Sequence, residues 1–484
     1  MGKVKLIVDN VYTSVENIDK DTEFAIWNEL SFQVQEYQEE HARKKHLYNR
    51  KTKKTYTGLI DHVIKVLNES GEDYEIIDNR IPYESNANFK LVDQIDIGNG
   101  KKIPLTARPY QQEIIDRATE REVIQAATGA GKTFIMAALI EKFNVMPVSV
   151  FADKLSLCNQ IKEEFEKFLG VPVGLVGGGI NQREDITVYS VQSATPEDVK
   201  DTKLMMVDEA HHIPAHTISE IARNCKNAYY RIGVSATPWR DGGDDLLIEA
   251  VLSKRRPEFA INASKLIELG YLVPATIHFV SIKQTFKGKN YHDVYQKAIV
   301  DNEERNDAII KIALQMHKRK KTQLILIQRI EHGKNLLDML SKKIPLESFT
   351  ITVDDPKNGK PTAVRVKNIE FLSGEDEAIR RKAVIQAVKE KKCQILIGST
   401  IADEGLDIPS LDCLILCGAG KSSTRAFQRI GRVLRIFEGK TRAIIFDFVD
   451  YTPMLRRHSR IREKLYKTEE KWEIKFLNPS LLKD

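Results

Sequence analysis

One segment, Ala126–Thr133 with the sequence AATGAGKT, constrains the fold of this chain more than any other. It follows an apolar, strand-like run at Val123–Ala127 and precedes a helix-forming run at Phe134–Ile140. A strand, a glycine turn and a helix in that order form a phosphate-binding loop, because the first N–H groups of the helix face the anion. The segment therefore predicts an α/β sheet that binds a nucleotide.

The residues of this segment have separate expected roles. Lys132 is placed to reach the β- and γ-phosphate oxygens of ATP, and the Thr133 hydroxyl is placed to ligate Mg²⁺. Ala126 replaces the glycine that opens the general pattern, so a helix N-cap without a nucleotide is the alternative interpretation. The expected phosphate cradle comprises Thr128, Gly129, Ala130 and Gly131.

An acidic pair follows the short apolar pattern Leu204–Val207. Asp208 and Glu209 then stand at the carboxyl end of a strand, where open α/β sheets bind ligands. We expect Asp208 to hold Mg²⁺ and Glu209 to orient and deprotonate the attacking water. An acidic strand exit that faces solvent is the alternative. The adjacent His211 and His212 lack a spaced partner, so the sequence predicts no zinc site.

A basic segment, Gln428–Arg435, lies far downstream. Catalysis of phosphoryl transfer needs a guanidinium where charge develops on the γ-phosphoryl group. Arg432 and Arg435 are the candidates, because their i, i+3 spacing predicts one shared helix face with Gln428. Arg429 is expected to lie off that face. A solvated basic helix is the alternative.

Together these segments resemble the superfamily 2 helicases with an Asp-Glu-Ala-His box, with matching order over about residues 105–450. Arg108-Pro-Tyr-Gln111 is similar to the family's Q-type motif, which implies that Gln111 reads adenine and that Arg108 supports it. Ser235-Ala-Thr237 is similar to motif III. That similarity implies that Ser235, Thr237 and the box residue His211 couple the nucleotide site to nucleic acid.

Two further motifs of the family have counterparts. Gly398–Pro409 resembles motif V, which implies that Thr400 contacts nucleic acid and that Gly405 and Asp407 border the nucleotide. Gln428–Arg435 resembles motif VI, which adds Gln428 to the nucleotide site. By position, Lys154 falls in motif Ia and Arg329 in motif IV, and Ser190 and Gln192 fall in motif Ic. Such side chains grip phosphates without reading sequence, although helix capping is an equal alternative for Ser190.

The N-terminal region contains seven basic residues in the twelve positions 43–54, interleaved with Tyr48 and followed by Tyr56. Such a patch can neutralise backbone phosphates while the tyrosines pack against sugars or bases. A solvated charged loop is the alternative. The order of patterns here is similar to the N-terminal region of the UvsW group of phage recombination helicases, which implies a small module that engages duplex DNA. The candidate contacts are Lys44, Lys45, Lys51 and Lys53.

Alternating strand and helix patterns predict the fold class: α/β, with two tandem RecA-like lobes of parallel sheet covered by helices and a small N-terminal α/β domain. The chain's 484 residues also exceed what one core usually supports. The expected domains are 1–97, then lobe 1 at 98–272, then lobe 2 at 273–484. Residues 92–104 are expected to be a linker. Lobe 2 is expected to contain a β-hairpin insertion at 347–371 and a basic C-terminal helix at 455–465, used for packing or for DNA.

Composition limits the class of protein. A formal net charge of +6 is small for this length, so only local clustering can indicate a polyanionic partner. Five scattered cysteines predict reduced, buried thiols in an intracellular protein. No apolar run approaches the roughly 20 residues that cross a bilayer. We therefore expect a soluble, cytoplasmic monomer, in the host cytoplasm if a phage encodes it.

The resemblance implies an ATP-dependent DNA helicase or translocase that acts on forks or Holliday junctions in replication, recombination or repair. Only 49 residues follow Arg435, which favours DNA over RNA as the substrate. The open alternatives are an RNA helicase and an ATP-gated duplex sensor or restriction-type motor subunit that does not unwind. The expected cofactors are ATP and Mg²⁺. The expected partners are DNA and replication or recombination proteins.

Overall fold

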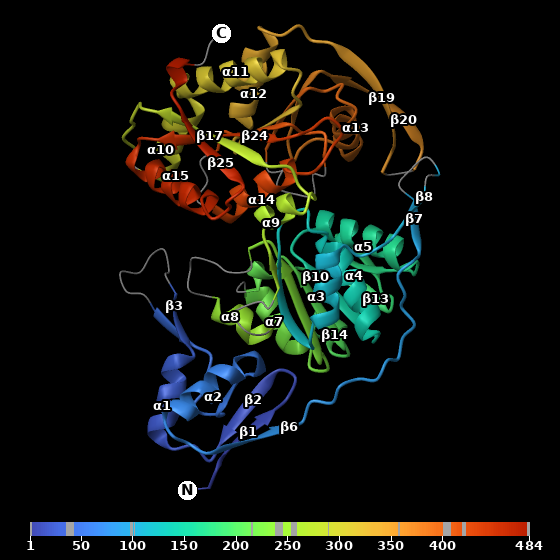
Figure 1. Ribbon diagram of the computed structural model, residues 1–484, viewed down its shortest axis with the longest axis vertical. Coiled ribbons are helices and arrows are strands. Elements are labelled where there is room, and N and C mark those ends of the chain that lie inside the picture. The colour runs from blue at the N-terminus through green and yellow to red at the C-terminus, as the bar shows by residue number, and fades with distance from the viewer. Residues whose placement is uncertain are drawn as a thin grey trace. The chain divides into compact units, whose positions relative to one another are not determined.

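The structure is a computed structural model that describes residues 2–34, 43–96, 100, 102–213, 216–237, 245–252, 259–288, 290–356, 359–399, 408–418 and 423–481 (Figure 1). Its internal contacts divide the chain into two compact units. Unit 1 comprises Met1–Ala126 and Gly131–Ile261, and unit 2 comprises Ala127–Ala130 and Asn262–Asp484.

Unit 1 begins with a four-stranded sheet of order β5-β2-β1-β6, in which β1 pairs antiparallel with β2 and parallel with β6. Apolar residues of helix α2 recur at helical spacing, and Val63, Val66 and Leu67 are buried in the core of this sheet. The elements are β1 (Val4–Val8), β2 (Tyr12–Glu16), α1 (Lys20–Glu29), β3 (Ser31–Val34), β4 (Arg43–His46), β5 (Lys54–Tyr56), α2 (Ile60–Glu69) and β6 (Tyr74–Asp78).

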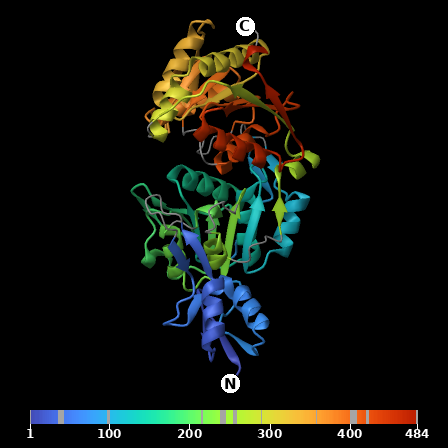
Figure 2. The ribbon, with the colours of Figure 1, turned by 90° about the vertical axis from the view of Figure 1, so that its left-hand side faces the viewer.

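The second sheet of unit 1 has eight strands in the order β12-β11-β13-β10-β14-β15-β9-β16, side by side in Figure 2. All neighbours pair in parallel except β11 and β12. The central strands β10 and β14 are mostly apolar and buried at every residue, as expected for a parallel sheet covered on both faces. The strands are β9 (Arg121–Ala126), β10 (Val148–Ala152), β11 (Gly174–Gly177), β12 (Ile180–Gln182), β13 (Ile186–Ser190), β14 (Leu204–Asp208), β15 (Tyr230–Ser235) and β16 (Ala260–Ile261). The helices are α3 (Pro109–Arg117), α4 (Lys132–Phe143), α5 (Leu155–Leu169), α6 (Pro196–Val199), α7 (His216–Asn224) and α8 (Leu246–Val251).

The two sheets of unit 1 are joined by a tight seam between the N-terminal region and α8. Leu247 and Ala250 of α8 belong to the same buried cluster as the core of the first sheet. A β-carbon on Gly58 would lie 2.0 Å from the Glu249 carbonyl oxygen, so only glycine fits there. The buried Arg121 guanidinium donates to the carbonyl oxygens of Leu252 at 2.8 Å and of Asn10 at 3.1 Å. Helix α8 therefore contributes residues to the cores of both sheets.

Unit 2 contains a seven-stranded, fully parallel sheet of order β21-β22-β18-β23-β24-β17-β25. Phe446 and Phe448 of β24 belong to the buried cluster that contains residues of α11 and α12, while Asp447 between them bonds to Arg462 of α15. The strands are β17 (Ala275–Ile282), β18 (Gln323–Leu326), β21 (Ile369–Leu372), β22 (Ile395–Gly398), β23 (Cys413–Leu416), β24 (Ala443–Asp450) and β25 (Trp472–Leu477). The helices are α9 (Ala263–Glu268), α10 (Tyr291–Tyr295), α11 (Glu303–Lys318), α12 (Ile330–Ser341), α13 (Ala378–Lys389), α14 (Ser423–Val433) and α15 (Pro453–Tyr466).

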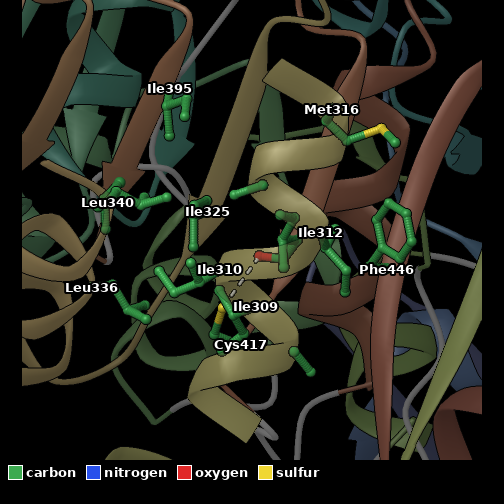
Figure 3. Packing of buried hydrophobic residues seen from close by; sticks show 14 of the residues in the cluster. Ile309, Ile310, Ile312, Met316, Ile325, Leu336, Leu340, Ile395, Cys417 and Phe446 are labelled. Atoms are coloured by element: carbon green, nitrogen blue, oxygen red, sulfur yellow. Dashed lines mark hydrogen bonds between the residues drawn. The ribbon is translucent and has the colours of Figure 1, made fainter. Parts of the chain in front are cut away.

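The core of unit 2 is built mainly from isoleucine (Figure 3). Ile309 and Ile312 of α11 pack with Ile325 of β18 and Leu336 of α12, and each is fully buried. β-branched side chains suit a pleated surface, and here they fill the space between sheet and helices. This cluster fixes α11 and α12 on one face of the sheet.

Three antiparallel pairs of described strands stand outside the large sheets, and two of them fall on the expected loops. β19 (Ser348–Asp354) pairs with β20 (Pro361–Lys367), from Ser348 opposite Lys367 to Asp354 opposite Pro361, so a hairpin is present within residues 347–371. β7 (Gln94–Asp96) pairs with β8 (Lys102–Pro104). Residues 92–104, predicted to be a linker, therefore contain a short pair of strands in which Ile95 lies opposite Ile103.

The arrangement confirms the predicted class of two parallel, helix-covered sheets with a small N-terminal α/β sheet. The domain limits 1–97, 98–272 and 273–484 stay predictions. All five cysteines are buried and free of disulfides, and burial raises the pKa of the Cys158 thiol to about 12. In the described part of the chain, no helix combines the length and apolarity that a membrane span requires.

Candidate nucleotide site and nucleic-acid interface

The predicted phosphate loop connects β9 to α4 in unit 1. β9 ends at Ala126 and α4 begins at Lys132, with Gly131 as its N-cap. Gly131 has a φ of 76° and Gly129 a φ of 91°, a left-handed backbone that other residues adopt only at a cost. Thr133 lies in the first turn of α4, as expected of a hydroxyl that ligates a cation beside the phosphates. The glycine spacing therefore has a conformational cause.

Gln111 lies against this loop. Its side chain is 4% exposed, and its Oε1 accepts the backbone N–H of Arg108 at 2.9 Å. A β-carbon on Gly131 would lie 2.6 Å from Gln111 Nε2, so the amide occupies the space that a side chain would fill. The Arg108 guanidinium donates to the Tyr110 hydroxyl at 3.1 Å. The structure thus brings the Q-type residues to the phosphate loop.

The Lys132 ammonium donates to Glu209 Oε1 at 2.5 Å. The pair is only partly shielded, with 16% of the Lys132 side chain and 21% of the Glu209 side chain exposed. Glu209 has a φ of 52°, which turns the chain sharply after β14. The loop lysine and the predicted catalytic base, 77 residues apart in the sequence, are therefore in direct contact.

Asp208 ends β14 and is 8% exposed. Its Oδ1 accepts the backbone N–H of Glu209 at 3.0 Å. Burial raises the pKa of the Asp208 carboxyl, against the lowering effect of Lys132. A cation at this carboxylate would favour its charged form, and Mg²⁺ usually takes one or two protein ligands, with water and phosphate oxygens completing the shell. The residues present therefore fit the predicted magnesium site.

The second oxygen of Glu209 enters a hydrogen-bonded network. Ser235 Oγ donates to Glu209 Oε2 at 3.2 Å and lies 3.0 Å from His211 Nδ1. The Thr237 N–H donates to the same hydroxyl at 3.2 Å. Burial alone would raise the pKa of Glu209, but Lys132 and His211 hold that pKa below its usual range. The residues expected to couple the site to nucleic acid are thus joined to Glu209.

Helix α14 carries the predicted arginine motif in unit 2, with one correction. Gln428, Arg429 and Arg432 lie in α14, but the helix ends at Val433. Arg435 instead forms an isolated antiparallel bridge with Leu272, and Leu434 accepts the N–H of Val273 at 2.8 Å. The predicted shared helix face of Arg432 and Arg435 is therefore wrong, because pairing with residues 272 and 273 draws the chain out of the helix.

Comparison with known proteins decides the family. The profile of the type III restriction enzyme res subunit matches residues 104–240, and the profile of the helicase conserved C-terminal domain matches residues 304–437. The chain belongs to the superfamily 2 helicases. Both profiles fall on the segments that hold the motifs described above, which confirms the predicted membership.

Relatives of this helicase include proteins of viruses, archaea and yeasts. Putative helicase 22 of Sulfolobus islandicus filamentous virus is 28% identical over 363 residues, which are 68% of this chain and 60% of that protein. DNA 3'-5' translocase XPB2 of Sulfurisphaera tokodaii is 26% identical over 69% of this chain and 80% of that protein. ATP-dependent DNA helicase uvsW of Enterobacteria phage T4 is 22% identical over 73% of this chain and 70% of that protein. The predicted relationship to uvsW is confirmed.

The fold also has solved counterparts. The fragment structure of a putative HsdR subunit of a type I restriction enzyme from Vibrio vulnificus YJ016 matches 93% of this chain and 91% of that one, with a TM-score of 0.55 and 17% identity. At this identity the likeness shows the fold alone. It confirms two RecA-like lobes, as the sequence predicts.

Thr400, Gly405 and Asp407 of motif V lie outside the described residues. Their assignments to nucleic acid and nucleotide stay predictions.

The candidate nucleic-acid contacts of unit 1 follow two neighbouring strand ends. Ala152 of β10 is paired with Ser190 of β13, so Lys154 and Gln192 emerge at the same edge of the sheet. Both are exposed, whereas Ser190 is 6% exposed. Ser190 does not cap α6, because Thr195 does so through Asp198. Lys154 and Gln192 are therefore the accessible side chains at this edge.

Arg329 begins α12 in unit 2 and is held by two aromatic residues. Its guanidinium donates to His292 Nδ1 at 2.7 Å and lies 5.9 Å from the centre of the Tyr295 ring. Arg329 remains half-buried. These contacts fix the direction of the one motif IV cation that the sequence predicts as a nucleic-acid contact.

The predicted basic patch is exposed at all four lysines. Lys44 and Lys45 lie on the ribbon formed by β3 and β4, and Lys51 and Lys53 lie on the tight turn before β5. In a ribbon successive side chains point to opposite faces, so Lys44 and Lys45 cannot both contact one flat surface.

Tyr48 of this patch does not have the expected role. Tyr48 is 2% exposed, with its hydroxyl 3.4 Å from Glu23 Oε1, so it belongs to the core. Stacked rings instead come from Phe24, Trp27 and His46, with Trp27 and His46 centroids 3.5 Å apart. Phe24 is 49% exposed and carries Arg50 over its ring. The i, i+3 spacing of Phe24 and Trp27 was the available signal, because it places both rings on one face of α1.

Proposed function

We propose that this helicase is an ATP-dependent DNA helicase or translocase that acts on branched DNA, such as forks and Holliday junctions, in replication, recombination or repair. One observation carries the ATPase part: Lys132, Glu209 and Ser235 form a continuous series of hydrogen bonds. The series runs from the phosphate loop to motif III. Movement of Lys132 toward bound phosphates would therefore alter the hydrogen bonds of Glu209 and Ser235, and Ser235 belongs to motif III.

The lysine acts first in the proposed cycle. Lys132 occupies Glu209 Oε1, and the γ-phosphate of ATP competes for that ammonium. When Lys132 turns to the phosphates, Oε1 is released to accept a proton from the attacking water. Ser235 and His211 keep Oε2 in place, so Glu209 does not have to search for its orientation.

The remaining proposed roles complete the nucleotide site. Mg²⁺ would neutralise charge on the β- and γ-phosphoryl oxygens. Thr133 and Asp208 hold the ion, Gln111 reads adenine, and the loop from Thr128 to Gly131 cradles the phosphates. Arg432 and Arg435 stabilise charge in the transition state, with Gln428 beside them.

The choice of DNA is supported by the relatives. One is described as a DNA 3'-5' translocase and another as an ATP-dependent DNA helicase. The exposed Lys44, Lys45, Lys51 and Lys53 would contact the duplex, and Lys154, Gln192 and Arg329 the tracked strand. We further propose that the protein is a monomer and works beside replication or recombination proteins.

A panel of nucleic acids tests this function. ATP hydrolysis and strand displacement are measured with blunt duplex, a fork, a four-way junction and structured RNA, with Lys132→Ala as the inactive control. We expect the fork and the junction to stimulate hydrolysis and to be unwound. Greater stimulation by RNA, or none by any DNA, would overturn the proposal.

A translocase that does not unwind is the second candidate. The match of residues 104–240 to a restriction subunit profile favours it. Displacement of a triplex-forming strand from duplex DNA reports translocation alone. Triplex displacement without fork unwinding would select this candidate over the first.

A further inference from the structure

Helix α15 of unit 2 has one face that is firmly attached to the sheet. Arg462 Nε donates to Asp447 Oδ2 at 2.8 Å, and the Tyr466 hydroxyl donates to the same oxygen at 2.9 Å. Ser459 Oγ donates to the Phe448 carbonyl oxygen at 3.1 Å, and Leu455 is fully buried. This inner face fixes both the position and the rotation of the helix. The choice between packing and DNA contact that the sequence left open is therefore not exclusive, since packing uses only one face.

The outer face of α15 is strongly basic. Arg456, Arg457, Arg460 and Lys464 are all exposed. Within the described chain none of the four has a carboxylate partner, and Arg456 alone has a contact, with the Tyr451 ring at 5.1 Å. Several exposed lysines of unit 2 have a carboxylate partner instead. Lys297, Lys342 and Lys392, for example, each lie 3.1 Å or less from a carboxylate oxygen.

These cations border a shallow groove of about 430 Å³. Tyr451 and Ile461 form its apolar wall, and both are partly exposed, at 38% and 36%. Here four cations without a carboxylate partner gather on one helix face beside two exposed apolar side chains, so the groove offers both charge and contact area to an anionic ligand. The groove therefore has the composition of an interface.

We infer that the outer face of α15, defined by Arg456, Arg457, Arg460 and Lys464, binds the phosphodiester backbone of nucleic acid. From Arg456 to Lys464 the helix rises about 12 Å, at 1.5 Å per residue. A duplex carries one negative charge per about 1.7 Å of its axis, so several phosphates lie within reach of these cations. The inference deepens the proposed function by adding a binding site outside the helicase motifs.

Two features favour nucleic acid over an acidic peptide. Three of the four cations are arginines, whose planar guanidinium matches a phosphate with two hydrogen bonds. Tyr451, with Arg456 against its ring, offers a surface on which a sugar or base can stack. The rigid attachment of the inner face also keeps the cations in a fixed row, as a regular polyanion requires.

The test replaces Arg456, Arg457, Arg460 and Lys464 together by Gln, which keeps length and helix propensity but removes charge. The matched control replaces four carboxylate-paired lysines of unit 2, Lys265, Lys297, Lys342 and Lys392, by Gln. Fluorescence anisotropy then gives the affinity for duplex DNA, single-stranded DNA and RNA as a function of salt. Circular dichroism and the melting temperature verify that both variants fold, and the single variant Arg460→Gln replaces the fourfold one if it does not.

We expect the fourfold variant to bind DNA at least 10-fold more weakly and to lose about 0.9 from the slope of log affinity against log salt for each phosphate contact removed. The control should keep the wild-type slope. An unchanged slope in a folded α15 variant would overturn the inference. So would equal loss in the control, or loss of binding to a polyglutamate probe with DNA binding intact, which would assign the face to an acidic protein.

The same measurements separate this inference from the proposed function. Wild-type protein whose DNA binding depends on α15, but whose ATP hydrolysis no DNA stimulates, would refute the function and keep the site. Stimulated hydrolysis with DNA affinity unaffected in the variant would refute the site alone.

Discussion

Each unit holds a carboxylate of its parallel sheet with a basic partner, Glu209 directly after β14 in unit 1 and Asp447 within β24 in unit 2, yet the two partners differ. Glu209 is held by Lys132, a flexible and partly exposed ammonium. Asp447 is held by Arg462 and Tyr466, with the Asp447 and Arg462 side chains 1% and 4% exposed. A ligand can compete with Glu209 for the exposed lysine, whereas the Arg462 guanidinium is buried. The exposure of the partner distinguishes a carboxylate that can do chemistry from one that holds the fold together.

The strongest loss of activity is expected from replacing Glu209. Glu209→Gln removes the proposed base, and we expect kcat of DNA-stimulated ATP hydrolysis to fall by about 10²- to 10⁴-fold with ATP binding retained. Asp447→Asn is the matched variant and should leave kcat per folded molecule unchanged. Undiminished turnover in purified Glu209→Gln protein would remove the assignment of the base.

The strongest loss of stability is expected from replacing Arg462. Arg462→Met leaves the Asp447 carboxylate buried and unpaired, so the free energy of unfolding should fall by about 3–5 kcal/mol in urea titrations. Arg442→Met removes an exposed pair with Glu473 in the same unit and should cost about 0–1 kcal/mol. Similar losses in both variants would show that burial of the Arg462 pair is unimportant.

A smaller effect is expected from replacing Ser235, which hydrogen-bonds to Glu209 and tests whether this contact couples ATP hydrolysis to strand displacement. Ser235→Ala removes hydroxyl contacts to Glu209, His211 and Thr237, each a hydrogen bond of roughly 1 kcal/mol. We expect strand displacement to fall more than ATP hydrolysis. Ser149→Ala, which removes a buried hydroxyl contact with Thr202 in the same sheet, should lower stability without changing the ratio of the two activities. An unchanged ratio in both variants would exclude a coupling role for Ser235.

The smallest effect concerns a third kind of partner, a histidine. His62 Nε2 lies 2.8 Å from Glu249 at the seam of unit 1, and this hydrogen bond raises the pKa of His62. A raised pKa in the folded protein adds stability below the unfolded pKa of about 6.5, and this addition disappears as pH rises through the folded pKa. We expect thermal unfolding of wild-type protein to lose stability from pH 6 to pH 8 relative to His62→Gln. Parallel pH profiles for the two proteins would contradict this.

Most of the fold was predictable because its buried strands are mostly apolar and alternate with helical patterns. The strand Leu204–Asp208, for example, extends the predicted apolar pattern Leu204–Val207 by one residue. The Lys132–Glu209 contact could not be predicted from the sequence. The resemblance assigns each residue a role toward bound ATP, but it does not say what either residue contacts when no nucleotide is bound. Arg435 was misplaced for a similar reason: its backbone pairs with Leu272, 163 residues away, and a local i, i+3 pattern contains no information on that pairing.

The basic patch shows a different limit. Charge was visible in the sequence, but the burial of Tyr48 depends on packing in the N-terminal sheet. From sequence alone, an aromatic residue among lysines can be interpreted equally well as a surface that stacks on bases or as part of the hydrophobic core. Only the fold separates the two, and it shows the exposed ring to be that of Phe24, stacked on the half-buried Trp27.

The close packing of Gly58 against α8 attaches the N-terminal sheet rigidly to the sheet that carries the phosphate loop. A fragment that starts after residue 97 would uncover Leu247 and Ala250 and would be prone to aggregate, so trimming this region is no neutral operation. DNA bound by the N-terminal lysines would therefore move together with the sheet that positions Lys132.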